Sequence, residues 1–339
     1  MQAIVQHGYS STETLTVEDV PVPNVGEGEV LVRVHAASLH ADIWHAVTGR
    51  PYVMRLMGTG LRKPKTTIPG IDLAGRVETV GPGVTRFAQG DEVFGECVRG
   101  IQWKNGGAFA EYASVLATDL APKPTGLSFV QAAAVPTSGL IALQTVHDEG
   151  HVTEGQRVLV NGAGGAVGAF ALQIARALGA NVTGVDSAEK LAALLAVGAD
   201  AVIDYRATDF TATGDRYDVI IDIPGNKSLS EVRRALTPEG TYVFVGHDQY
   251  GARGHSVIGS IGRFAHMFVM TPFVPQFKRP GRISPRSERL TKLAEMCEAG
   301  DITPLVDCTY PLANIHEALR HLEDGTAIGK IMLTMTDSD

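Results

Sequence analysis

Hydrophobic and polar residues follow two different patterns along the 339 residues of the chain. The first 125 residues carry short apolar, β-branched runs such as Val30–Val34, and turn pairs such as Gly81-Pro82 and Gly90-Asp91 separate these runs. Apolar residues at helical spacing are scarce in this part. The pattern predicts a compact β-rich domain.

The pattern changes at Ser128, where strands and helices begin to alternate. Ser128 and Gln131 have the spacing of a capping box, which starts a helix. The strands predicted after it are Arg157–Asn161, Asn181–Asp186, Ala201–Ile203, Tyr217–Asp222 and Thr241–Val245. The helices predicted between them are Val167–Leu178, Ala188–Val197 and a helix capped by Ser228 and Glu231. Apolar strands that alternate with helices predict a parallel sheet covered on both faces.

The last part of the chain is irregular before it returns to helix and strand. Gly and Pro are frequent in His247–Ser284, which also contains the uncharged apolar stretch Phe264–Phe277. This stretch could pack against a substrate, a second subunit or the core. The elements predicted after it are a helix from Ser284-Pro285 to about Gly300, a helix capped by Asn314 and Glu317, and the strand Lys330–Thr334.

The composition narrows the class of protein. At about 100–200 residues per domain, the length suggests two domains. Asp and Glu number 37 against 29 Lys and Arg, and the net charge of −8 gives no general attraction to nucleic acid or to an acidic membrane surface. The cysteines Cys97, Cys297 and Cys308 lie too far apart in sequence for a four-thiolate zinc site or a disulfide framework, and they fit a reducing cytoplasm.

Two long uncharged stretches could be mistaken for membrane spans. Pro124–His147 contains prolines, glutamines and hydroxyl side chains, and Val158–Ala175 has a glycine cluster in its middle. Both are more typical of buried segments of a soluble protein. Met1–His7 shows no basic region followed by an apolar run, so no signal peptide is expected.

A glycine-rich loop follows the predicted strand Arg157–Asn161. Glycines allow a tight turn and let a pyrophosphate approach the backbone, and the N-terminus of the next helix supplies free N–H groups for that phosphate. Asp186 ends the second strand, 24 residues after Gly162, where a ribose-binding carboxylate is expected. We therefore predict a nicotinamide dinucleotide in contact with Gly162, Gly164, Gly165, Ala166, Val167 and Gly168.

Asp186 also bears on which dinucleotide binds. A carboxylate there accepts hydrogen bonds from the ribose of NAD(H) and repels the extra phosphate of NADP(H). Ser187 and Lys190 follow at once, and Lys190 could either pair with that phosphate or lie on a solvated helix face. The sequence favours NAD(H) weakly and leaves NADP(H) open.

Several motifs stand in the order found in one enzyme superfamily: Gly70-Ile-Asp72-Leu-Ala-Gly75-Arg-Val, Gly90-Asp-Glu-Val-Phe-Gly95, Gly107-Ala-Phe-Ala-Glu-Tyr112, the glycine loop, Val202-Ile-Asp-Tyr205 and Gly329-Lys330-Ile. With them, almost the whole chain resembles the medium-chain dehydrogenase/reductase superfamily, and within it the zinc-free quinone oxidoreductase branch. The resemblance implies an α/β fold. A GroES-like β-rich catalytic domain (1–127 plus 305–339) would be interrupted by a Rossmann domain with a doubly wound parallel sheet (128–304). It also implies an active site in the cleft between the domains, and a homodimer.

The resemblance also implies where a catalytic zinc would be bound. Zinc-dependent relatives use a Cys, a His and a second Cys, and the matching positions here are His40, Ile71 and about Ala134. Two of these side chains offer no ligand atom, so we predict no metal in the cleft.

Without zinc, hydride passes from the nicotinamide to a conjugated acceptor, and a protein group must hydrogen-bond or protonate the acceptor oxygen. Our candidates for that group are His40 and Tyr52, although His40 could instead be a buried structural histidine and Tyr52 a packed aromatic. The branch usually has Asn-x-x-Asp where this chain has His40 and Ile43. The residues expected to line the substrate pocket are Asp42, Trp44 and His45.

The resemblance places further residues around the cofactor. Thr137 and Ser138 would meet its nicotinamide side, unless Ser138 caps a helix. Tyr205 and Asn226 would face the adenosine half, and Val245 and Gly246 would close over the ring. Lys330 would lie near the cleft, unless it is an ordinary surface lysine.

These features predict a cytoplasmic, NAD(P)H-dependent, zinc-independent reductase of quinones or other α,β-unsaturated carbonyls. The aromatic and methionine side chains of Phe264–Phe277 suit a bulky apolar small molecule as acceptor, such as a quinone or an extended enone. Interconversion of isolated carbonyls and alcohols is an alternative, although it would need a Lewis acid. The irregular His40–Ile43 segment also leaves open a dinucleotide-binding redox sensor without turnover.

Overall fold

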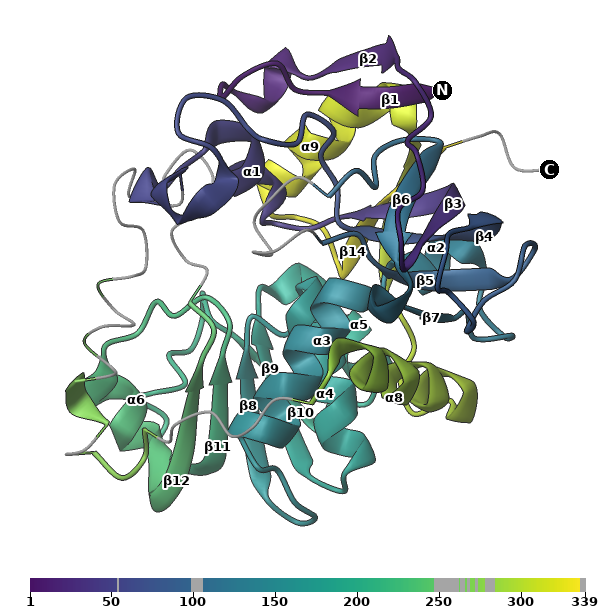
Figure 1. Cartoon of the computed structure of the whole chain (residues 1–339). Coiled ribbons are helices and arrows are strands. Elements are labelled where there is room, and N and C mark those ends of the chain that lie inside the picture. The colour runs from purple at the N-terminus through teal and green to yellow at the C-terminus, as the bar shows by residue number, and fades with distance from the viewer. Residues whose placement is uncertain are drawn as a thin grey trace.

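Two sheets of different character organise the protein (Figure 1). The structure is a computed structural model that describes residues 1–53, 55–98, 106–246, 262, 266, 269–271, 274–277 and 284–335. A mixed, mainly antiparallel sheet contains strands from both ends of the chain, and a parallel sheet contains strands from the middle. The predicted fold, a β-rich domain with an inserted Rossmann domain, is confirmed.

The mixed sheet has seven strands in the order β13-β14-β3-β4-β5-β7, with β6 paired to β3. Strand β14 runs antiparallel to β3, with Ile331 opposite Leu39, so the C-terminal segment completes the N-terminal sheet. In Figure 1 the yellow β14 lies among purple and blue strands. The strands are β3 (Glu29–Leu39), β4 (Asp72–Val80), β5 (Glu92–Glu96), β6 (Tyr112–Leu116), β7 (Leu120–Pro122), β13 (Val306–Pro311) and β14 (Lys330–Thr334).

Short elements and one longer helix surround this sheet. Strands β1 (Gln2–Val5) and β2 (Thr16–Asp19) form a separate antiparallel pair. Helix α9 packs against β13, β14 and β3 and buries Ile315, Ala318 and Leu319. The helical elements of this region are η1 (Thr12–Thr14), α1 (Ile43–Thr48), η2 (Arg55–Thr59), η3 (Ala117–Asp119), η6 (Leu312–Asn314) and α9 (Ile315–Asp324).

The second sheet has five parallel strands in the order β10-β9-β8-β11-β12, as predicted. From β8 the chain first adds strands on one side (β9, β10) and then on the other (β11, β12), so β8 and β11 flank the topological switch point. In open parallel sheets of this kind, ligands bind at the carboxyl ends of the strands beside the switch point. The strands are β8 (Arg157–Asn161), β9 (Asn181–Asp186), β10 (Ala201–Asp204), β11 (Tyr217–Asp222) and β12 (Leu236–Phe244). The helices that accompany these strands are α3 (Pro136–Leu143), η4 (Gln144–Glu149), α4 (Ala166–Ala177), α5 (Ala188–Ala196), α6 (Leu229–Ala235) and α8 (Arg286–Ala299). Helix α2 (Phe129–Ala133) precedes them in the chain and packs against β3 and β4 of the mixed sheet.

Most predicted element boundaries agree with the structure, with three corrections. Both capping boxes are present, at Ser128 and Ser228. Asn314 occupies the N-cap of α9, but its side chain does not accept the capping hydrogen bond. Strand β12 begins at Leu236, five residues before the predicted start. The helix α1 was missed, because a six-residue element shows hardly two turns of the helical pattern.

The two uncharged stretches do not form membrane-spanning helices. Pro124–His147 is divided among α2, α3 and η4, and Val158–Ala175 comprises β8, the glycine loop and most of α4. Within the described residues, no helix has the length and apolar character needed to cross a bilayer.

Much of His247–Ser284, including Phe264 itself, lies outside the described residues. Two described side chains of this segment, Val274 and Phe277, are buried in one cluster with Tyr242 and Phe244 of β12. These two side chains therefore pack into the core of the inserted domain.

Candidate active site

The loop between β8 and α4 has the close backbone packing that only glycine permits. Gly162 has a φ of 81°. A Cβ on Gly164 would lie 2.6 Å from Cδ of Lys190, and a Cβ on Gly168 would collide with the carbonyl oxygen of Gly162. The loop therefore fits against strand β9 and leads directly into the N-terminus of α4, the arrangement that binds a pyrophosphate.

The carboxylate of Asp186 is already engaged at this loop. It accepts hydrogen bonds from the N–H groups of Gly164 (2.8 Å) and Ser187 (2.9 Å). Lys190 does not lie on a solvated helix face: it is 8% exposed, donates to the carbonyl oxygen of Gly325 (3.0 Å) and lies 3.9 Å from Asp186. Lys190 thus connects the inserted domain to the turn after α9, beside the expected ribose position.

A polar network that the sequence did not predict lies at the carboxyl ends of β8 and β11. The carboxylate of Asp222 accepts hydrogen bonds from Asn161 Nδ2 (2.8 Å), Gly225 N–H (2.9 Å) and the Tyr242 hydroxyl (2.8 Å). Asn226 joins it, since Asn161 Nδ2 also lies 3.4 Å from Asn226 Oδ1. Asp222 ends β11, and the partners that mark it as part of a site come from β8, β12 and the turn after β11, which are apart in sequence.

The other predicted cofactor residues lie around the same strand ends. The backbone N–H groups of Val245 and Gly246 donate to the carbonyl oxygens of Asp222 and Ile223 (3.0 and 3.1 Å). The backbone N–H of Tyr205 donates to the carbonyl oxygen of Asp186 (3.1 Å), and its ring is half exposed beside Arg206. The predicted cofactor residues therefore lie at the carboxyl ends of all five strands of the parallel sheet.

Two hydroxyl groups begin helix α3. Thr137 and Ser138 are fully buried, and the N-cap residue is Val135, so Ser138 does not cap the helix. Within the described residues, Ser138 Oγ has no hydrogen-bond partner. A buried hydroxyl without a partner costs free energy, and a polar group of a bound ligand would supply the missing bond. The orphaned hydroxyl and the glycine loop both fit a nicotinamide dinucleotide.

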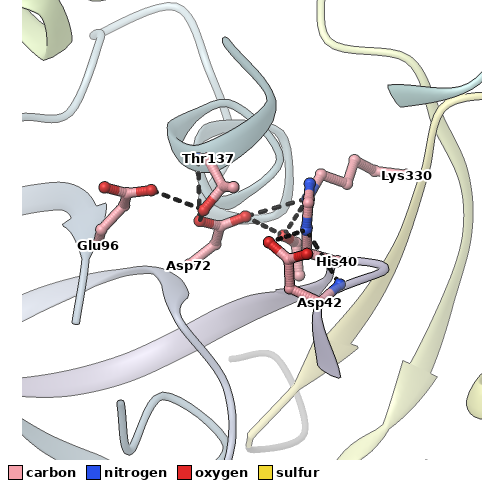
Figure 2. A network of polar contacts seen from close by, with 7 residues as sticks. His40, Asp42, Asp72, Glu96, Thr137 and Lys330 are labelled. Carbon is pink, nitrogen blue, oxygen red and sulfur yellow. Dashed lines mark hydrogen bonds and ion pairs between the residues drawn. The ribbon is translucent and has the colours of Figure 1, made fainter. Parts of the chain in front are cut away.

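A buried ion pair joins the N- and C-terminal parts of the catalytic domain (Figure 2). Lys330 is 2% exposed, and its Nζ lies 3.0 Å from Asp72 Oδ2 and 2.9 Å from Ser38 Oγ. Lys330 is therefore no surface lysine. The adjacent Gly329 N–H donates to the carbonyl oxygen of Gly164 (3.0 Å), which places the ion pair next to the glycine loop.

Asp72 also connects the two domains through Thr137. The Thr137 N–H and Oγ1 both lie against Asp72 Oδ1, at 3.0 and 2.5 Å. Thr137 Oγ1 is also 2.7 Å from Glu96 Oε1, although a hydroxyl has only one hydrogen to donate. Either Glu96 or Asp72 must therefore carry a proton for both contacts to be hydrogen bonds.

Of the two carboxyl groups, Glu96 rather than Asp72 carries that proton. Burial and the nearby charge of Asp72 raise the pKa of Glu96, and Arg286 opposes the shift only in part. Asp72 instead pairs with Lys330 and accepts hydrogen bonds from the Ser38 hydroxyl (2.6 Å) and the Thr137 N–H. Arg286 of α8 also pairs with Asp119 (2.9 Å), so this cluster anchors the inserted domain to the mixed sheet.

The raised pKa of Glu96 predicts a pH-dependent stability. The folded state keeps a proton that the unfolded state releases, so the free energy of unfolding is highest below the ordinary glutamate pKa and falls as pH rises through the raised pKa. Glu96→Gln, which is neutral at every pH, is expected to flatten this slope in denaturant titrations between pH 4 and 9. An equally steep slope in Glu96→Gln would contradict the assignment.

His40 and Asp42 form a second buried pair, where β3 leads into α1 (Figure 2). His40 Nδ1 lies 3.2 Å from Asp42 Oδ2. Trp44 is buried in α1, whereas His45 Nδ1 lies 2.6 Å from the carbonyl oxygen of Arg50. His45 therefore holds the chain after α1, and Asp42 is the predicted pocket residue that directly contacts His40.

Tyr52 lies apart from this network. Its side chain is 42% exposed, and the guanidinium of Arg55 lies 4.8 Å from its ring centre. Arg55 is held in turn by the carbonyl oxygens of Gly49 (2.9 Å) and Thr48 (3.0 Å) at the end of α1. The structure does not bring Tyr52 into contact with His40.

The positions that match the ligands of a catalytic zinc do not form a ligand set. Ile71 and Ala134 are buried apolar residues, and the Asp72 carboxylate forms an ion pair with Lys330. The donor chemistry beside His40 therefore does not fit zinc as zinc-dependent relatives bind it.

Comparison with known proteins agrees with the geometry. Residues 26–125 match the alcohol dehydrogenase GroES-like domain, and residues 197–333 match a zinc-binding dehydrogenase family. The chain is 30% identical to a probable zinc-binding oxidoreductase, mitochondrial, of Arthroderma benhamiae over 98% of this chain and 96% of that protein. It is also 30% identical to a quinone oxidoreductase of Rattus norvegicus, over 99% of this chain and 98% of that protein.

Among solved structures, the quinone oxidoreductase from Coxiella burnetii superposes with a TM-score of 0.81 at 26% identity and covers 99% of both chains. The chain therefore belongs to the quinone-oxidoreductase-like branch of the medium-chain dehydrogenase/reductase superfamily and is an NAD(P)H-dependent oxidoreductase.

Proposed function

We propose that the protein reduces quinones or other α,β-unsaturated carbonyls without zinc. In this proposal, His40 is the group that donates a proton to the acceptor oxygen. The buried His40–Asp42 pair carries this proposal, because it occupies the place where zinc-dependent relatives begin their ligand set. The similarity to quinone oxidoreductases supports the acceptor class.

Bound NAD(P)H supplies a hydride to the electrophilic carbon of the acceptor, and the acceptor oxygen then gains negative charge. In the structure, His40 Nδ1 accepts the Asp42 backbone N–H (3.3 Å). In our proposal, the protonated ring instead donates its Nδ1–H to the Asp42 carboxylate, 3.2 Å away. The opposite nitrogen, Nε2, then donates its proton to the acceptor oxygen. A donor placed in a buried site needs little reorganisation during the reaction.

A conjugated acceptor suits this arrangement better than an isolated carbonyl. Conjugation spreads the developing charge before the proton arrives, whereas an isolated carbonyl needs stronger polarisation, usually from a metal. We expect Lys330 to stay paired with Asp72 and to position the network rather than to touch the acceptor.

Cofactor preference follows from Asp186. We expect NADH to bind more tightly than NADPH, because the Asp186 carboxylate would repel the 2′-phosphate. Asp186→Asn keeps an acceptor for the Gly164 N–H but removes the charge. The ratio of the NADPH to the NADH dissociation constant should fall by at least about tenfold in this variant. Fluorescence titration with both cofactors measures the ratio, and an unchanged ratio would reject the role of Asp186.

Tyr52 is expected to contribute less than His40. If its hydroxyl reaches the acceptor during turnover, Tyr52→Phe lowers kcat and leaves the affinity for NADH unchanged. Because the phenylalanine ring still packs on Arg55, the fold should be preserved. An unchanged kcat would restrict Tyr52 to packing.

An acceptor panel tests the proposed reaction. Loss of NAD(P)H absorbance should be fast with a quinone or a conjugated enone and slow with the matching saturated ketone. Activity confined to saturated aldehydes and alcohols would instead support carbonyl–alcohol interconversion. The homodimer and the cytoplasmic location also belong to this proposal, and sedimentation of the purified chain measures the first.

A further inference from the structure

A cluster of potential metal ligands lies in the mixed sheet outside the cleft. Asp307 and Cys308 belong to the edge strand β13, and His321 lies in the last turn of α9. Their ligand atoms all lie within 4.8 Å of one another, and no other such group occurs in the part of the chain that the structure describes. We propose that Asp307, Cys308 and His321 bind a zinc-like divalent cation that anchors α9 to β13.

An irregularity in β13 brings two consecutive side chains to the same helix. Neighbours in a regular strand point to opposite faces of the sheet. Here the pairing with β14 shifts register between Val306 and Cys308, which makes Asp307 the extra residue of a bulge. Bulges redirect side chains in this way. The sequence alone shows only an Asp-Cys pair, without any sign that both residues reach His321.

The distances around His321 suit a tetrahedral cation. Cys308 Sγ lies 3.3 Å from His321 Nδ1, and Asp307 Oδ2 lies 3.3 Å from Nε2. In a tetrahedral zinc site, neighbouring S, N and O ligand atoms are about 3.4–3.6 Å apart. Cys308 and Asp307 lie at opposite ring nitrogens, and one cation uses only one of them. The Asp307 carboxylate must therefore move toward Nδ1 to close the set, from an arrangement in which the ligand atoms lie within 4.8 Å of one another.

Three polar side chains, those of Asp307, Cys308 and Tyr310, already contact the His321 ring. The Tyr310 hydroxyl (3.2 Å) and the Cys308 thiol (3.3 Å) both approach Nδ1 of His321. If Nδ1 is an acceptor, it has a single lone pair, so only one of these two groups can donate to it. In our proposal, a cation takes this lone pair and displaces the thiol proton. Its ligands, one thiolate, one imidazole and one carboxylate, are those that zinc prefers.

The partial exposure of the cluster allows a cation to enter. The side chains of Asp307 and His321 are 21% and 24% exposed. The second carboxylate oxygen of Asp307 accepts the Ile328 N–H (3.0 Å), which orients the group. Outer hydrogen bonds of this kind commonly hold metal-binding carboxylates. The cation would thereby fix the segment that leads from β13 through α9 to Lys330.

Cobalt(II) titration of the full chain, purified without a histidine tag, tests the proposal. We expect one equivalent of cobalt to produce a sulfur-to-cobalt charge-transfer band in the near ultraviolet, and zinc to abolish that band. Zinc should also raise the Tm of the wild-type chain, because a ligand that binds only the folded state stabilises it. Neither readout depends on enzyme activity, so the outcome is independent of the proposed function.

Three variants and one control locate the metal. Cys308→Ser and His321→Gln should lose the band, and Asp307→Asn should bind cobalt at least about tenfold more weakly. The control Cys297→Ser should keep it, since Cys297 lies on α8, outside this cluster. Circular dichroism without metal confirms that Cys308→Ser is folded. Absence of the band in the wild-type chain, or a band that survives Cys308→Ser, would overturn the proposal.

Discussion

His40→Ala is expected to lower kcat by about 10²-fold or more with a conjugated enone, while the dissociation constant for NADH changes little. Removing a positioned proton donor usually costs 10²–10⁴-fold in rate. His40 is nearly buried and contacts Asp42, so its loss removes a pre-organised donor rather than a cofactor contact. Steady-state kinetics together with a cofactor titration separates the two effects.

His40→Asn provides the matched control. Asparagine stands at this position in the branch that the chain resembles, and its amide can donate a hydrogen bond but cannot transfer a proton at neutral pH. We expect it to recover part of the lost rate. Asp42→Asn should lower kcat less than His40→Ala, because it only weakens the stabilisation of the imidazolium. If His40→Ala retains the wild-type rate, His40 is a structural residue.

Lys330→Met is expected to lower the free energy of unfolding by about 3–5 kcal/mol. The variant leaves the charge of Asp72 buried without its cation, although the Ser38 and Thr137 hydrogen bonds remain. Equilibrium denaturation in urea measures the effect. A loss below about 1 kcal/mol would match an exposed ion pair and contradict the buried geometry.

The double variant Asp72→Asn/Lys330→Met tests the reason for that loss. Removing both charges should restore much of the stability, because no uncompensated charge remains in the core. A double-mutant cycle with the two single variants gives the coupling free energy. Additive losses would show that Lys330 contributes through packing of its alkyl chain alone.

Local patterns gave a reliable prediction of the Rossmann part of the fold. The glycine loop, the end of β9 at Asp186 and the capping boxes at Ser128 and Ser228 depend on residues that are close in sequence. The same holds for the apolar strands of the parallel sheet. Such features can be predicted from the sequence, because the residues that form each of them belong to one supersecondary unit.

The contacts that distinguish the site depend on residues far apart in the chain. Lys330 pairs with Asp72 across 258 positions, and Lys190 reaches Gly325 across 135. A lone lysine in a sequence is most often solvated, so the sequence left both lysines open between a place at the site and a place on the surface. The contacts of Glu96 are a further example, because Thr137 and Arg286 come from the other domain.

The most direct test of the account is the turnover of chelator-treated protein with NADH and a conjugated enone, measured against the saturated ketone of the same carbon skeleton. We predict that the enone is reduced at the untreated rate and that added zinc does not accelerate it. The saturated ketone should react far more slowly. Loss of enone turnover after chelation with recovery on adding zinc, in the wild-type chain and equally in Cys308→Ser, or equal rates for both substrates, would contradict zinc-independent hydride transfer to an α,β-unsaturated carbonyl.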